Sequence, residues 1–181
     1  MLFATYIEAN SKMKENAIIS LNETKDYIKC ITAELTQNFK EVINGDWGLN
    51  QSSDMKNVFL IDIEVFADGY GLALYPCNNK VTQLGYKKLL EKYSDGPLRD
   101  DNYKWGLDFN SYDFDNELDL KEIDEYYNSL TKFYFEWISY CWDQAGGTFF
   151  LKPIYLMMHD GTESFDLRKK DWIDDMTKWQ Q

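Results

Sequence analysis

Histidine, cysteine, proline and basic residues are all scarce in this 181-residue chain. The single histidine, His159, cannot build a multi-histidine zinc site, and no two cysteines lie at metal-ligand or redox-motif spacing. The three cysteines (Cys30, Cys77 and Cys141) are an odd number and lie far apart. We therefore expect reduced thiols, no disulfide framework, and no metal or other cofactor.

The scarcity of bases excludes one large class of partners. Lysine and arginine number 19 against 31 aspartates and glutamates, which leaves a net charge of −12. Since nucleic-acid binding requires cations that displace phosphate counterions, we expect no nucleic-acid partner. No apolar run approaches the roughly 18 residues of a membrane span, and the N-terminal segment lacks the pattern of a secretory signal. We expect no membrane partner and a cytoplasmic location.

Motifs that would indicate an enzyme are missing as well. The chain has no nucleotide-binding glycine loop, nucleophile elbow or HExxH motif, so we do not expect catalysis. A Cys–His nucleophile pair between Cys141 and His159 is formally possible, but Cys141 falls on an apolar helical stripe, where a buried structural thiol is the better explanation. A calcium loop starting at Asp113 would have Leu118 where glycine is required and Asp124 where glutamate is usual. A glycosidase pair remains open, although 31 carboxylates make some suitable separation inevitable.

The residues that are present predict a folded domain. Hydrophobic residues make up 44% and aromatic residues 17%, enough for a packed core in one domain. Residues 1–45 have helical periodicity, with Asn22 as a possible cap between two helices and Gly45 as the stop. Residues 58–75 alternate around Asp68-Gly69, which predicts a β-hairpin whose acidic residues face solvent.

The spacing of hydrophobic residues changes again in the second half of the chain. Residues 82–93 have the leucine spacing of a short helix, and residues 120–145 form a long aromatic stripe with Asp119 as its cap. The overall prediction is a single α+β domain, in which an antiparallel sheet of hairpins carries an N-terminal helical pair and the long helix. The remaining segments are an acidic-aromatic loop region at 95–119, a hairpin at 148–167 and a C-terminal helix at 168–181.

The acidic-aromatic stretch is the strongest functional signal. Residues 95–125 hold eleven carboxylates against three bases, a net charge of −8, and aromatic rings stand between them. Disordered acidic tails are poor in such rings, whereas tyrosine and tryptophan are frequent interface anchors. We therefore predict that this stretch binds a basic protein partner. The predicted contact residues are Trp105, Asp108, Tyr112, Asp113, Asp115, Glu117 and Asp119.

A small acidic α+β protein without a catalytic signature resembles the immunity proteins of bacterial contact-dependent inhibition and polymorphic toxin systems. The resemblance rests on this stretch and on FEWISYCWDQAGGTFFLKPIYLMMHDG, where a long aromatic helix passes through Gly-Gly into a hairpin. It implies a protein that neutralises a basic toxin domain by stoichiometric occlusion. Two alternatives remain open: a small-molecule-binding or hydrolytic domain with a carboxylate site, and a self-associating structural subunit.

Overall fold

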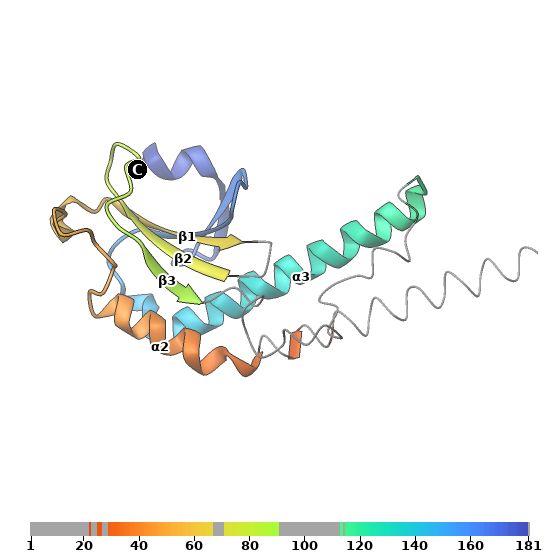
Figure 1. Ribbon diagram of the computed structural model, residues 1–181, viewed down its shortest axis with the longest axis horizontal. Coiled ribbons are helices and arrows are strands. Elements are labelled where there is room, and N and C mark those ends of the chain that lie inside the picture. The colour runs from red at the N-terminus through yellow and green to blue at the C-terminus, as the bar shows by residue number, and fades with distance from the viewer. Residues whose placement is uncertain are drawn as a thin grey trace, which may run out of the picture. The chain divides into compact units, whose positions relative to one another are not determined.

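A computed structural model describes residues 22, 25–26, 29–66, 71–90, 113 and 115–180 (Figure 1). The described residues form a six-stranded sheet with α-helices and short 3-10 helices, so the predicted α+β class is confirmed. The strands are β1 (Leu60–Phe66), β2 (Gly71–Cys77), β3 (Lys87–Leu90), β4 (Ile154–Met158), β5 (Glu163–Asp166) and β6 (Asp171–Asp174). The helices are α2 (Thr32–Ile43), α3 (Glu117–Gln144), η1 (Met55–Asn57), η4 (Gly147–Phe149) and η5 (Asp175–Gln180).

The sheet is mixed rather than wholly antiparallel. Its strand order is β3-β2-β1-β4-β5-β6, and the central pair β1–β4 is parallel while the other neighbours are antiparallel. Strand β4 follows α3 in the sequence and lies beside β1, with which it runs in the same direction. Strands β1 and β2 pair antiparallel, as do β4 and β5, as the two predicted hairpins require. The second hairpin begins later than predicted, because Gly147–Phe149 is the 3-10 helix η4 and the strand starts at Ile154. The two antiparallel pairs are joined through the parallel pair β1–β4.

The described chain divides into two compact units. The first holds the described residues up to Thr32 and from Asp113 to Trp137, and the second holds the sheet with residues 33–66, 71–90 and 138–180. Helix α3 has 28 residues, about 42 Å at 1.5 Å per residue. Its last turns, from Ile138 onward, belong to the sheet unit, and its earlier residues belong to the first unit.

The main core of the sheet unit lies on the side of α2. Ile61, Ile63 and Val65 alternate on one face of β1 and are fully buried. Phe39 of α2 and Trp142 of α3 are also buried, with ring centroids 5.3 Å apart in an edge-to-face arrangement. In the sheet unit, Figure 1 shows α2 on one side of the strands and η5 on the other.

The predicted helix at 82–93 is wrong. Lys87–Leu90 form the edge strand β3, and Gln83 and Gly85 make isolated bridges before it. A Cβ on Gly85 would lie 2.2 Å from the Gly48 carbonyl oxygen, so the two backbones meet directly here. The buried pair Leu89 and Leu90 belongs to a strand, and this long-range approach overrides the local leucine spacing.

The predicted C-terminal helix at 168–181 is also wrong in its first half. The Asp166 carboxylate accepts the backbone N–H groups of Arg168 and Lys169 at 2.9 and 3.0 Å, and Lys170 has a positive φ of 59°. These features turn the chain back, so Asp171–Asp174 pairs with β5 as strand β6. The helical part is the 3-10 helix η5.

Smaller differences concern the element ends. Asn22 is itself helical, so it does not cap a helix there, whereas Gly45 closes α2 with a φ of 103° as predicted. The hairpin predicted to end at residue 75 runs on to Cys77, and the Pro76 carbonyl accepts the Leu84 N–H at 2.7 Å. The Asp68-Gly69 turn lies outside the described residues. Among the residues that the structure describes, no helix combines the length and apolarity of a membrane span.

Candidate functional site

The predicted partner-binding residues fall partly within the described structure. Trp105, Asp108 and Tyr112 lie outside the described residues. The structure places the other four at the start of α3. Asp113, Asp115 and Glu117 are exposed, whereas Asp119 is buried with 6% of its surface exposed.

Asp119 does not cap the helix, and the predicted start at 120 is wrong. Helix α3 begins at Glu117, and the Asn116 side-chain oxygen accepts the Leu118 N–H at 2.9 Å, which is the bond of an N-cap. The Asp119 carboxylate reaches back to accept the Asp113 N–H at 2.8 Å. Asp119 therefore stabilises the entry to the helix and is too buried to meet a partner.

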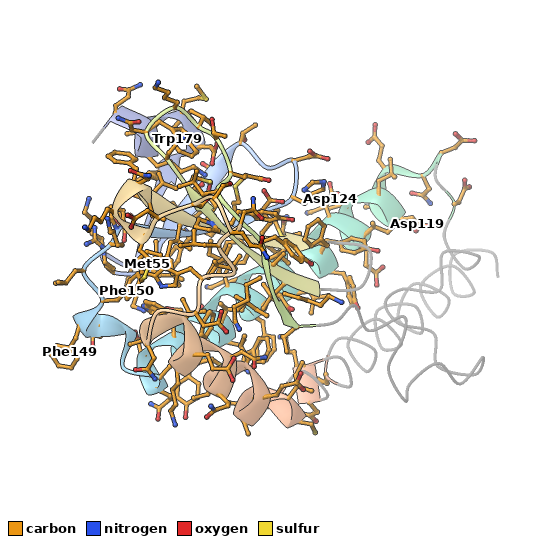
Figure 2. The ribbon with its side chains drawn as sticks, turned by 60° about the vertical axis from the view of Figure 1, so that its left-hand side comes forward. Met55, Asp119, Asp124, Phe149, Phe150 and Trp179 are labelled. Atoms are coloured by element: carbon orange, nitrogen blue, oxygen red, sulfur yellow. The ribbon has the colours of Figure 1, made fainter. Side chains whose placement is uncertain are left out.

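The outer side of the first turns of α3 carries acidic and apolar groups together. Glu117, Asp124 and Glu125 are exposed, and Lys121 makes only a long 3.8 Å ion pair with Glu125. Figure 2 shows Asp119 and Asp124 on these turns. We define the acidic-apolar face by its exposed residues: Asp113, Asp115, Glu117, Leu118, Leu120, Asp124, Glu125 and Tyr127.

The apolar members of this face are large and unusually open. Leu118 is 59% exposed, Leu120 is 42% exposed and Tyr127 is 38% exposed. The exposed carboxylates Glu117, Asp124 and Glu125 form an acidic stripe along α3. At 100° per residue, Leu120 and Tyr127 lie along one flank of this stripe and Leu118 lies along the other. The buried stripe, which includes Ile123 and Leu130, faces the opposite way.

A second cluster, made of charged and polar side chains, lies on the η5 side of the sheet, and the sequence did not predict it. Lys178 of η5 is 1% exposed, and its ammonium group lies 2.8 Å from the Asp62 carboxylate and 2.6 Å from the Asp175 carboxylate. The Ser164 hydroxyl donates to Asp175 at 2.6 Å and lies 3.3 Å from the ammonium nitrogen. The aromatic ring of Trp179, labelled in Figure 2, has its centroid 5.3 Å from that nitrogen.

Burial sets the proton affinities around this cluster. It raises the pKa of Asp62 to about 6, and the positive charge of Lys178 opposes that rise without cancelling it. Burial also raises the pKa of the neighbouring Cys77 thiol to about 12, with a further contribution from the Asp62 charge. The prediction that the acidic residues of β1 face solvent is wrong at Asp62, which is buried on the η5 side of the sheet.

The geometry does not favour the Cys141–His159 pair or the calcium loop. Burial raises the pKa of the Cys141 thiol to about 11, so the sulfur is protonated at neutral pH and is a poor nucleophile. His159 instead places Nδ1 3.0 Å from a Glu64 carboxylate oxygen. Residues 117–124 of the supposed calcium loop are helical and cannot wrap around an ion. Within the described part of the chain, no group of three or more potential ligands could hold a metal ion.

Sequence reasoning had little chance of finding the Lys178 cluster. Asp62 lies in a strand of alternating apolar and acidic residues, and this pattern predicts that the acidic residues face solvent. Lys178 belongs to a charged tail, where a lysine is ordinarily exposed. Only the packing of η5 on the sheet brings the two charges together. Comparisons with protein-family models, curated proteins and solved structures found no match to this chain.

Proposed function

We propose that this protein captures a basic protein partner by stoichiometric binding, in the manner of an immunity protein that occludes a toxin domain. The observation that carries this proposal is the acidic-apolar face at the start of α3. Exposed carboxylates and exposed leucine and tyrosine side chains alternate there within about three helical turns. Among the described residues no group of three or more possible ligands could hold a metal ion, and the Cys141 thiol is not activated.

The two kinds of side chain have different roles in such an interface. Exposed carboxylates attract a cationic surface over distances near the Debye length, about 8 Å at physiological salt, and so increase the association rate. Leu118, Leu120 and Tyr127 offer apolar area that contact would remove from water, which slows dissociation. Leu120 and Tyr127 share one flank of the helix, and a partner would cover this exposed apolar pair.

The test begins with a pull-down from the native organism and identification of the partner by mass spectrometry. Association is then measured at low and at physiological salt for the variant Asp115→Lys/Glu117→Lys/Asp124→Lys. Among the residues that the structure describes, none donates a hydrogen bond to these three side chains or forms an ion pair with them. We expect association to slow at least tenfold at low salt and its salt dependence to flatten.

The matched control is Glu34→Lys/Glu136→Lys/Glu163→Lys, which makes the same change in net charge at three exposed positions outside the face. It should slow association only slightly, because long-range attraction falls while the face remains intact. Leu118→Ala/Leu120→Ala should leave the association rate unchanged and increase the dissociation rate. Equal slowing by both triple variants, or capture of an acidic partner, would remove the support for this function.

A further inference from the structure

A cationic cavity lies at one end of the sheet, apart from the acidic-apolar face. Its volume is about 520 Å³, and its lining includes Lys56, Lys80 and Lys152. The sheet topology brings these three distant residues together. Parallel strands β1 and β4 begin at the same end of the sheet, and the antiparallel strand β2 ends there. Each lysine stands in the segment just outside one of those strand ends.

The charge of this cavity is opposite to that of the protein. No carboxylate is among its lining residues, although the chain as a whole carries −12. Within the described residues, Lys56, Lys80 and Lys152 form no ion pair with a carboxylate. Other lysines of the sheet unit do form such pairs, as Lys87 does with Glu41 and Asp46. The lining therefore carries three lysines and no carboxylate.

Hydrogen bonds hold part of this lining in place before any ligand arrives. The Lys152 ammonium donates to the Val58 carbonyl at 2.6 Å, which fixes the side chain at the cavity wall. The Asn78 side-chain oxygen accepts the N–H groups of Lys80 and Thr82 at 2.8 and 3.0 Å. With its oxygen occupied, the Asn78 amide group offers N–H donors. The lining thus presents donors and positive charges, which suit an anion.

The cavity also has an apolar part. Val58 is buried, and Phe59 and Leu84 are half-buried beside the polar groups. Sites for small molecules are typically about 300–1,000 Å³ and combine apolar walls with a few polar groups. We propose that this cavity binds a small organic anion. Its doubly charged head, a phosphate monoester or a pair of carboxylates, lies on the lysines, and its apolar body lies on Phe59 and Leu84. This site is independent of the proposed partner-binding function.

Isothermal titration calorimetry of the full chain in phosphate-free buffer tests this proposal with three probes. Phenyl phosphate carries a phosphate head and an apolar ring, phthalate carries two carboxylates on the same kind of ring, and inorganic phosphate has no apolar body. We expect one-to-one binding of phenyl phosphate, of phthalate or of both, tighter than that of inorganic phosphate. The tighter of the two aromatic anions identifies the head group.

Two double variants locate the site. Lys56→Gln/Lys80→Gln should weaken binding of the aromatic anion at least tenfold, because two of the three charges disappear. Lys40→Gln/Lys132→Gln makes the same change in net charge at exposed positions outside the cavity, and should leave binding within twofold. The proposal is overturned if no probe binds saturably, if inorganic phosphate binds as tightly as both aromatic anions, or if the two double variants weaken binding equally.

Discussion

The ammonium group of Lys178 lies 2.8 Å from the carboxylate of Asp62, and neither side chain is more than 9% exposed. Asp62 belongs to the first strand, and Lys178 belongs to the last helical segment, so the pair ties the end of the described chain to the centre of the sheet. Desolvating two charges is costly, and the pair is maintained only while both members are present. Substitution of Lys178, which is buried on the η5 side of the sheet, should therefore destabilise the fold.

Lys178→Met should lower the free energy of unfolding by about 3–5 kcal/mol, because it leaves the Asp62 charge buried without compensation. Equilibrium denaturation in urea at pH 7 measures this loss. Lys40→Met changes an exposed lysine of α2 and should cost less than about 1 kcal/mol. The double variant Asp62→Leu/Lys178→Met should recover most of the loss. A Lys178→Met protein as stable as the wild type would show that the pair does not hold η5 on the sheet.

Asp62 should make stability fall as pH rises from about 4 to about 6. The folded protein holds the Asp62 proton up to a pKa of about 6, whereas the unfolded chain releases it near 3.8, so protonation favours the folded state in this window. Relative to Asp62→Asn, the wild type should lose up to about 3 kcal/mol between these pH values, at about 1.4 kcal/mol per unit of pKa. Parallel stability curves of the two proteins across this window would show that Asp62 does not titrate in it.

Gly147→Ala should destabilise the protein through steric overlap with Trp142. A Cβ at Gly147 would lie 2.1 Å from a ring atom of Trp142, and this ring is fully buried between Phe39 and Phe150. Overpacking of this kind costs about 1–3 kcal/mol or more. Thermal unfolding and near-ultraviolet circular dichroism, which reports tryptophan packing, should both change.

The neighbouring substitution Gly146→Ala separates overlap from backbone strain. A Cβ there meets no atom within 4 Å, but the φ of 95° is unfavourable for alanine. We expect a cost of about 1 kcal/mol with an unchanged near-ultraviolet spectrum. If both substitutions altered the spectrum equally, the contact between Gly147 and Trp142 would not be the cause.

The thiols should react in two classes. Cys30 is exposed, whereas Cys77 and Cys141 are buried, with pKa values raised by burial to about 12 and about 11. The native protein should therefore expose one rapidly reacting thiol to a disulfide reagent at pH 8, and the denatured protein should expose three. Loss of the rapid class in Cys30→Ser would confirm the assignment. A total of one thiol in the denatured, non-reduced protein would reveal an internal disulfide.

Local patterns in the sequence were sufficient for the α+β class, the two hairpins and the long helix. Alternation around 58–75 and the helical stripe of α3 are short-range signals, because each reflects one element burying one of its own faces. The acidic composition of the α3 start was equally readable. The local geometry of this segment could not be predicted from the sequence. The Asp119 carboxylate accepts the Asp113 N–H and is buried, whereas its acidic neighbours are exposed.

Tertiary structure decided the features that depend on distant segments. Lys87–Leu90 became a strand because Gly48 and Gly85 bring two backbones into contact, and residues 171–174 became a strand because Asp166 turns the chain back onto β5. The burial of Asp62 and Lys178 and the gathering of three lysines at one sheet end follow from strand order. The sequence around one charged residue does not show which distant charged residue it will contact. The pairing of strands in the sheet determines which of them share a face or an end.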